Sequence, residues 1–192
     1  EGLAAAMARQ SLAALADADA AVVLVDARDG VTAGDAEIVD AVRRSGKPVR
    51  RAVNKTEGLE REAVLAEFHE LGLGRPAAIA ARRGQGVTEL IADLLEELPP
   101  ADEGMPAENA EDAIRLAVIG RPNVGKSTLI NRMLGEERVV VFDTPGTTRD
   151  SVSVPFQRDG QDYVLVDTAG IRRRSRVDEA IEKFSVVKAL QA

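Results

Sequence analysis

The sequence predicts an α/β fold in which a parallel sheet carries helices on both of its faces. Short apolar runs of strand type alternate along the chain with longer segments of helical periodicity, a pattern typical of consecutive strand–helix units. One unit holds a glycine-rich loop between its strand and its helix, which is the order in which phosphate-binding loops occur. With 192 residues, the chain is long enough for one or two domains.

Residues 1–98, the first segment, contain the first series of alternating elements. Gly46 and Pro48 mark the end of one helix, and Thr88 is expected to cap the last helix, because its hydroxyl can accept a hydrogen bond from a free N–H group of the first turn. The expected elements are a helix from Ala4 to Ala16, a strand from Ala20 to Val25, a helix from Asp35 to Ser45, a strand from Val49 to Val53, a helix from Leu59 to Leu71, a strand from Ala77 to Ala80 and a helix from Glu89 to Leu98.

Residues 99–113 differ in composition and are expected to form a solvated linker. Two prolines are followed by five carboxylates and no basic residue; the carboxylates are Asp102, Glu103, Glu108, Glu111 and Asp112. The second segment, residues 114–192, begins with a strand from Ile114 to Ile119 and a helix from Thr128 to Leu134. A hairpin is expected next, with strands from Val152 to Arg158 and from Gln161 to Val166 and its turn at Asp159-Gly160.

Composition excludes several classes of function. The chain has no cysteine, so disulfides and thiolate metal sites are excluded and a reducing cytoplasm fits. No apolar run is long enough to span a membrane, and no membrane partner is expected. A net charge of −7 argues against a chain that clamps nucleic acid along its whole surface.

The stretch Gly120-Arg-Pro-Asn-Val-Gly-Lys-Ser127 fits the pattern of a phosphate-binding loop. Gly120 and Gly125 can adopt backbone angles that let the loop wrap closely around an anion. The N–H groups of the loop and the start of the following helix then face the phosphates. Lys126 adds a positive charge for the β- and γ-phosphates, and the Ser127 hydroxyl is placed to bind Mg²⁺.

Two further stretches of the second segment fit the same chemistry. Asp167-Thr-Ala-Gly170 lies at a predicted strand end downstream of the loop, where the carboxylate can support Mg²⁺ and the glycine N–H can meet the γ-phosphate. Thr147 and Thr148 lie between these two stretches. A hydroxyl there can reach Mg²⁺ and order its loop only while a γ-phosphate is present.

Asn54-Lys55-Thr56-Glu57 follows a predicted strand and suits recognition of a base. The amide of Asn54 can address the purine edge, and Lys55 can lie along the base. The carboxylate of Glu57 can accept from the N–H groups that guanine has and adenine lacks. Four such residues are common, so this interpretation depends on their occurring together with the phosphate loop.

These stretches resemble the sequence boxes of translation-factor-like GTPases, and most closely those of the Der (EngA) family. The resemblance rests on the stretches above together with Gly146-Thr-Thr-Arg-Asp150, Met7-Ala-Arg-Gln-Ser11, Val25-Asp-Ala-Arg28, Leu71-Gly-Leu-Gly74 and Asp167-Thr-Ala-Gly-Ile-Arg-Arg-Arg174. It implies the G-domain fold of P-loop NTPases. Residues 1–98 would be the C-terminal half of a first G domain, 99–113 a linker, and 114–192 the N-terminal half of a second, so the chain is expected to be a fragment. It also implies GTP hydrolysis in ribosome biogenesis, with the large ribosomal subunit and rRNA as partners of the full-length protein, and a cytoplasmic monomer.

The resemblance further implies a set of site residues. Lys126, Thr148 and Gly170 would be catalytic; Ser127, Thr148 and Asp167 would bind Mg²⁺; and Asn123 would bind K⁺, because Ile171 stands where other GTPases carry a glutamine that orients water. The residues expected to contact GTP or GDP are Gly120, Arg121, Pro122, Asn123, Val124, Gly125, Lys126, Ser127, Thr128, Asp167, Thr168, Ala169, Gly170, Ile171, Asn54, Lys55, Thr56 and Glu57.

Alternatives remain open at this point. In one, the two segments are two half-domains with exposed sheet edges; in another, they assemble like a circularly permuted single G domain in which Asn54 and Lys126 serve one nucleotide. A further alternative is an interaction module that binds nucleotide without hydrolysing it. An ATP-using P-loop enzyme is a third interpretation, against which the stretch from Asn54 to Glu57 argues.

Overall fold

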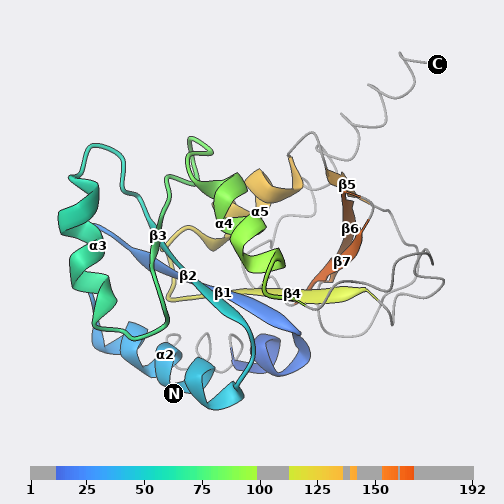
Figure 1. The fold of residues 1–192 in the computed structure, drawn as a ribbon, viewed down its shortest axis with the longest axis horizontal. Helices are drawn as coiled ribbons and strands as arrows, with labels where there is room; N and C mark the ends of the chain where they lie inside the picture. The colour runs from blue at the N-terminus through green and yellow to red at the C-terminus, as the bar shows by residue number, and fades with distance from the viewer. Residues whose placement is uncertain (1–11, 99–112, 136–138, 142–152, 160, 167–192) are drawn as a thin grey trace.

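Seven strands form one sheet in the computed structural model, which describes residues 12–98, 113–135, 139–141, 153–159 and 161–166 (Figure 1). The strand order is β3-β2-β1-β4-β7-β6-β5. The strands are β1 Ala20–Asp26, β2 Val49–Asn54, β3 Ala77–Ala78, β4 Ile114–Ile119, β5 Val139–Val141, β6 Val154–Arg158 and β7 Gln161–Leu165. The first segment supplies β1 to β3 and the second supplies β4 to β7, so the pairing of β1 with β4 joins the two segments in a single sheet.

The sheet is mostly parallel, as predicted. β3, β2, β1, β4 and β7 run parallel to one another, and the register places Asp26 of β1 opposite Asn54 of β2. The predicted hairpin is present as β6 and β7, which pair antiparallel with a turn at Asp159. The sequence analysis missed β5, which pairs antiparallel with β6. Its three residues are too few to show a strand periodicity.

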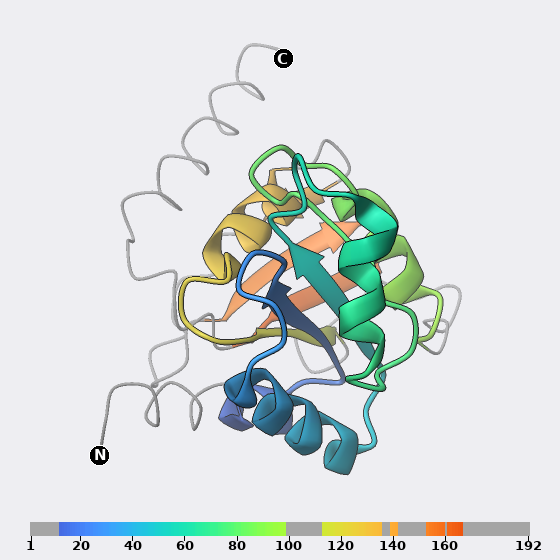
Figure 2. The same ribbon diagram turned by 90° about the vertical axis from the view of Figure 1, so that its left-hand side faces the viewer.

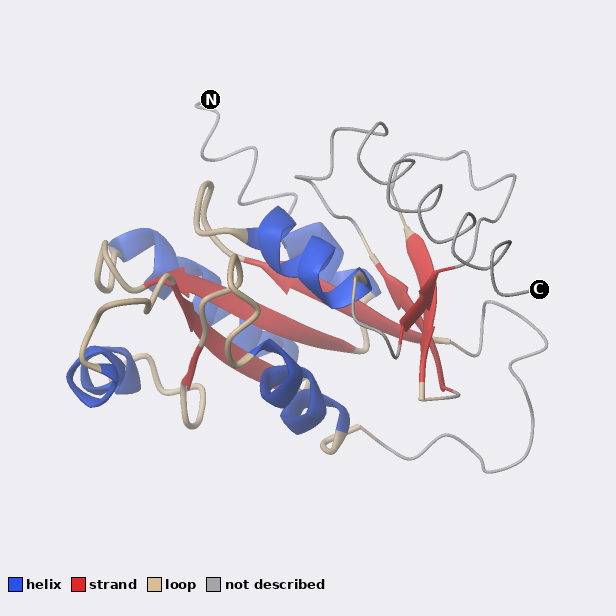
Figure 3. Ribbon diagram, turned by 90° about the horizontal axis from the view of Figure 1, so that it is seen from above, coloured by secondary structure: helices blue, strands red, loops and turns tan. Residues whose placement is uncertain are grey.

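Helices cover both faces of the sheet, as predicted (Figures 2 and 3). The helices are α2 Ala33–Ser45, α3 Arg61–His69, α4 Val87–Leu95 and α5 Lys126–Leu134, and residues 12–17 are also helical. The α4 and α5 helices pack on one face, and α2, α3 and the helical residues 12–17 pack on the other. The two faces therefore enclose separate apolar cores.

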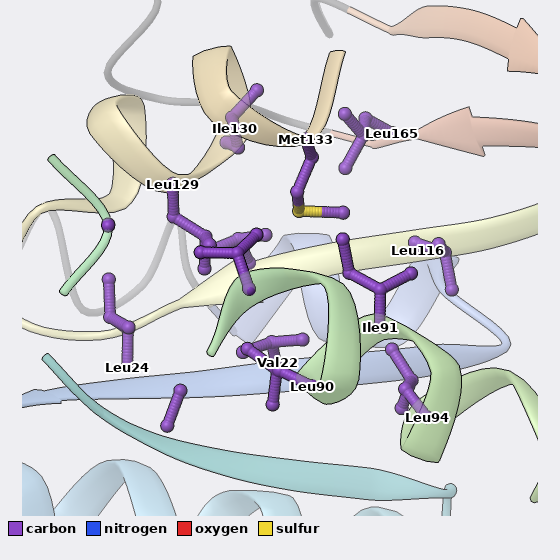
Figure 4. Packing of buried hydrophobic residues seen from close by; sticks show 14 of the residues in the cluster. Val22, Leu24, Leu90, Ile91, Leu94, Leu116, Leu129, Ile130, Met133 and Leu165 are labelled. Atoms are coloured by element: carbon purple, nitrogen blue, oxygen red, sulfur yellow. The ribbon is translucent and has the colours of Figure 1, made fainter. Parts of the chain in front are cut away.

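The β1 strand lies at the centre of this arrangement, and all seven of its residues are buried. Val22 and Leu24 point towards α4 and α5, where the side chains shown in Figure 4 meet. Val23 and Val25 point to the opposite face, towards α2 and α3. Burying a side chain of this size contributes about 1.5–3 kcal/mol, so the strand that joins the two segments is also a main source of hydrophobic stabilisation.

Some predicted boundaries were wrong. The prediction that Thr88 caps its helix is corrected by the structure, because α4 begins at Val87 and its N-cap is Gly86. Gly86 has a φ of +72°, and a Cβ atom there would lie 2.6 Å from the carbonyl oxygen of Ala78. The turn into α4 thus needs a glycine, and the helix starts one residue before Thr88 rather than after it.

Several other elements also have limits that differ from those predicted. The strand predicted from Ala77 to Ala80 covers only Ala77–Ala78, after which Ile79 accepts hydrogen bonds from both the N–H and the hydroxyl of Thr56. The helix predicted from Leu59 to Leu71 is two residues shorter at each end. The α2 helix begins at Ala33, two residues early, because Thr32 and Asp35 form a capping box. Residues 1–11 and 99–112 lie outside the described residues.

Candidate functional site

The predicted site lies where parallel strands end. The loops that follow β1, β2 and β4 leave the same edge of the sheet, because these strands run parallel in adjacent positions. After β1 the chain continues to β2 and β3 on one side of this point, whereas after β4 it continues to the strands on the other side, β5, β6 and β7. The carboxyl edge at such a change of direction is where open α/β sheets bind their ligands.

The predicted phosphate loop joins β4 to α5 and presses closely on its neighbours. A Cβ atom at Gly120 would lie 2.3 Å from the carbonyl oxygen of Leu24 in β1. Gly125 has a φ of +106°, and a Cβ atom there would lie 2.4 Å from the Nδ2 atom of Asn54. Both glycines are therefore required by close approach, and both contacts reach across to the first segment.

Lys126 is held inside this loop. It opens α5, and its Nζ atom donates to the carbonyl oxygens of Gly120 at 2.8 Å and Arg121 at 2.7 Å. Burial lowers the pKa of Lys126. The ammonium is thus partly desolvated against two neutral carbonyls, an arrangement that an anion could improve. Ser127 follows in the first turn of the helix, beside N–H groups that point towards the loop.

Asn54 connects the two segments at the site. Its side chain is buried, with an exposed fraction of 3%. Nδ2 donates to the carbonyl oxygen of Val124 in the phosphate loop at 2.8 Å, and Oδ1 accepts from the N–H of Ala81 at 3.0 Å. The base-reading stretch and the phosphate loop are therefore in direct contact, as the hypothesis of one assembled site requires.

Lys55 makes a second connection of the same kind. Its Nζ atom donates to the Asn123 carbonyl oxygen at 2.9 Å and pairs with the carboxylate of Asp26. Asp26 is buried at the end of β1, and its other oxygen accepts from the N–H of Arg28. The lysine is thereby fixed along the phosphate loop, with its charge neutralised by a carboxylate from the neighbouring strand.

Glu57 carries an unused acceptor. Its Oε2 atom is buried and has no hydrogen-bond partner among the described residues, while Oε1 lies 3.8 Å from the Nη2 atom of Arg28. A buried carboxylate oxygen without a donor is unfavourable, so a donor from a ligand would stabilise it. Thr56, by contrast, uses its hydroxyl on Ile79 within the protein.

The sequence analysis missed several residues that shape the site. Asp26 fixes Lys55, and the N–H of Ala81 fixes Asn54. The side chain of Arg121 pairs with Asp35 and Asp29 of the first segment. The sequence held two local signals for these contacts: a capping-box pattern at Thr32 and Asp35, and a carboxylate at the end of an apolar strand. Neither signal indicates which distant residue the carboxylate contacts.

Several predicted residues cannot be placed. Thr148 and residues 167–171 lie outside the described residues, so only Ser127 of the three expected Mg²⁺ ligands is described. Within the described ranges, no group of three or more His, Cys, Asp or Glu residues could hold a metal ion. Magnesium in phosphate-loop proteins is held mainly by phosphates, water and single hydroxyls, so this finding leaves the Mg²⁺ prediction untested.

Comparison with known proteins gives a consistent result. Residues 115–192 match the family of 50S ribosome-binding GTPases. Over its whole length, the chain is similar to proteins named GTPase Der: 57% identical to that of Halorhodospira halophila, 53% to that of Aromatoleum aromaticum and 55% to that of Dechloromonas aromatica. It covers 41%, 43% and 43% of these relatives, and so spans about two fifths of their length. None of the helices that the structure describes has the length and apolar content needed to cross a membrane.

Proposed function

We propose that this chain belongs to the GTPase Der family, and that it binds one guanine nucleotide between its two segments and hydrolyses GTP there. One observation carries the proposal. The side chain of Asn54, from the first segment, donates to Val124 in the phosphate loop of the second. A single nucleotide can therefore reach the base-reading stretch and the phosphate loop together.

The base end of the site suits guanine. The buried Oε2 atom of Glu57 is without a donor among the described residues, and guanine offers N–H groups that adenine lacks. Asn54 is held rigidly by Val124 and Ala81, so its position is fixed before a base arrives. A preorganised, buried acceptor discriminates strongly, because a base without the matching donor leaves it unpaired.

The phosphate end suits a di- or triphosphate. Lys126 and the N–H groups of the loop and of the first turn of α5 would bind the phosphates, and Ser127 would bind Mg²⁺ together with Thr148 and Asp167. Magnesium supplies charge neutralisation between the phosphates. Lys126, Thr148 and Gly170 are the proposed catalytic residues, and Asn123 is the proposed ligand of K⁺.

The wider role is proposed from the relatives. Residues 1–98 and 114–192 would belong to two successive G domains of a longer protein, with residues 99–113 as the linker. In that protein the nucleotide cycle would serve assembly of the large ribosomal subunit, with rRNA as a partner, in the cytoplasm and from a monomeric protein.

The direct test is equilibrium binding of fluorescent GDP to the chain with Mg²⁺, in competition with GTP and ATP. We expect GTP to compete and ATP not to compete. Glu57→Gln should weaken GDP binding by about 10–100-fold, because a hydrogen bond to a charged acceptor contributes about 1.5–3 kcal/mol. The same variant should gain affinity for xanthosine diphosphate, whose base offers an acceptor to the new amide.

Glu97→Gln is the matched control, because Glu97 pairs only with Arg50 in the ion pairs described and lies at the other end of β2. Unselective binding of GDP and ATP by the unmodified chain would contradict a guanine site. Single-turnover GTP hydrolysis with and without K⁺ then separates a GTPase from a module that only binds nucleotide. Tight binding without hydrolysis under either condition would favour the binding module.

A further inference from the structure

Arg121 lies in the phosphate loop, but its side chain binds the first segment. Its Nε atom lies 2.9 Å from Oδ1 of Asp35, and its Nη2 atom lies 3.1 Å from Oδ2 of Asp29. Asp29 and Asp35 lie in and just after the connection between β1 and α2. The guanidinium therefore links the phosphate loop to the start of α2 across 86 residues of sequence.

The carboxylate of Asp35 is prepared for this pairing. Its side chain is fully buried, and its Oδ2 atom accepts from the N–H of Thr32 at 3.0 Å and from the Thr32 hydroxyl at 2.7 Å. These bonds leave Oδ1 directed at Arg121. Gly34 completes the arrangement, because a Cβ atom there would lie 2.9 Å from the Cδ atom of Arg121. The stem of Arg121 thus lies on the first turn of α2 where no side chain intervenes.

The ion pair is stronger than an ordinary surface pair. Burial by itself would lower the pKa of Arg121, but the hydrogen bonds and charges of Asp35 and Asp29 outweigh it and raise the pKa. The arginine side chain has an exposed fraction of 24%, and the Asp35 side chain has none. A pair with one fully buried partner is screened less by salt than an exposed pair.

The same residue supports the phosphate-binding lysine. The carbonyl oxygen of Arg121 accepts from Nζ of Lys126 at 2.7 Å. The side chain of Arg121 is thus anchored on Asp35, while its carbonyl oxygen contacts Lys126. A shift of the anchor would therefore move the backbone that holds the lysine.

We propose that Arg121 is a positioning residue: its ion pair with Asp35 fixes the phosphate loop against the start of α2 and so determines how tightly the loop holds the β-phosphate. The inference rests on the proposed function and deepens it, because it assigns a role within the same phosphate site. It predicts a defect confined to the phosphate end, with the choice of base unaffected.

The test is a double-mutant cycle on the full chain, with Arg121→Met, Asp35→Asn and both together, measured by binding of GDP, GMP and ADP. Methionine keeps an unbranched apolar stem over Gly34 and removes the charge, and asparagine keeps an acceptor for Thr32. We expect Arg121→Met to weaken GDP binding about tenfold and GMP binding less than about threefold, with an unchanged preference of GDP over ADP. The double variant should be little worse than either single variant, because residues that act as one unit are not additive. Arg121→Lys should restore part of the loss, because it keeps the charge but not the planar fork.

Arg50→Met with Glu97→Gln is the matched control cycle. Arg50 has a similar exposed fraction, 28%, and its ion pair with Glu97 is remote from the phosphate loop. Urea unfolding of each variant without nucleotide measures how much the substitution changes the free energy of unfolding. Equal losses for GDP and GMP, or losses that the control cycle reproduces, would overturn the positioning role. An unmodified chain that does not distinguish GDP from ADP would overturn the proposed function as well. Failure of the proposed function is therefore seen in the unmodified chain, and failure of the positioning role is seen in the variants.

Discussion

Replacing Asn54 with alanine tests whether the two segments are held together at the site. The side chain is buried and makes two hydrogen bonds, to the carbonyl oxygen of Val124 and from the N–H of Ala81. Alanine would leave both backbone groups without these partners, at about 1–3 kcal/mol each. We therefore expect the free energy of unfolding to fall by about 2–6 kcal/mol, a large part of the 5–15 kcal/mol typical of a domain.

The measurement is urea denaturation of the nucleotide-free chain followed by circular dichroism, because the sequence has no tryptophan and one tyrosine. The unmodified chain should unfold in one transition, since β1 and β4 share one sheet. The variant should have a lower midpoint with an unchanged dependence on urea. Asn131→Ala is the matched control: Asn131 is exposed on α5, and its replacement should change stability by no more than about 0.5 kcal/mol.

Two results would refute the reasoning. A loss below about 1 kcal/mol would mean that the buried amide does not contribute the two bonds at their usual strength. Two separate transitions in the unmodified chain would mean that the segments unfold independently. In that case the contacts at Asn54 would not couple them, and the single-site proposal would lose its main support.

Three further predictions follow from individual contacts. Gly125→Ala should reduce GDP affinity at least about tenfold, because backbone strain at its positive φ adds to a steric clash with Asn54. The control Gly46→Ala, at a φ of +66° with no neighbouring atom within 4 Å, should lower the free energy of unfolding by only about 1 kcal/mol and leave GDP affinity unchanged. The Cε resonance of Lys126, assigned by its loss in Lys126→Arg, should titrate in the nucleotide-free chain below the 10.5 of an ordinary lysine, because burial lowers the pKa of Lys126. The free energy of unfolding should accordingly rise with pH through that lowered pKa, and GDP should raise the pKa. A titration at 10.5 would show that the ammonium is not desolvated. Lys47→Met should destabilise the chain by about 1–3 kcal/mol without changing GDP affinity, because Nζ donates to three carbonyls at the end of the helical residues 12–17; an unchanged unfolding midpoint would contradict this.

Much of the fold could be predicted from the sequence, because the signals are local. The strands Ala20–Asp26 and Ile114–Ile119 are mostly apolar, and the helix Ala33–Ser45 ends at a glycine in the left-handed conformation. The phosphate loop was also predictable, since its glycines, lysine and serine occur at fixed spacing. The start of α4 was predicted wrongly, because it depends on the close approach of Gly86 to the carbonyl oxygen of Ala78 and not on a local capping pattern.

The site could be predicted only in part. The sequence predicted site residues in Asn54-Lys-Thr-Glu57 and in the phosphate loop, but it did not predict the residues that they contact. Asp26 pairs with Lys55 only because β1 and β2 are adjacent and in register. The pairing of Arg121 with Asp35 likewise could not be predicted, because it joins the phosphate loop to the first turn of α2, which lies on the other side of the acidic linker in the sequence.

The sequence by itself determined the alternation of strands and helices and the phosphate loop, and it predicted a base-reading role for Asn54-Lys-Thr-Glu57, because each of these patterns is specified within a few neighbouring residues. Only the tertiary structure decided that the two segments share one sheet and that Asn54 touches Val124, 70 residues further along the chain. The physical reason is that β1 can pair with β4 on one side and β2 on the other only in the folded chain. That pairing brings the carboxyl ends of all three strands, and the residues after them, to one edge.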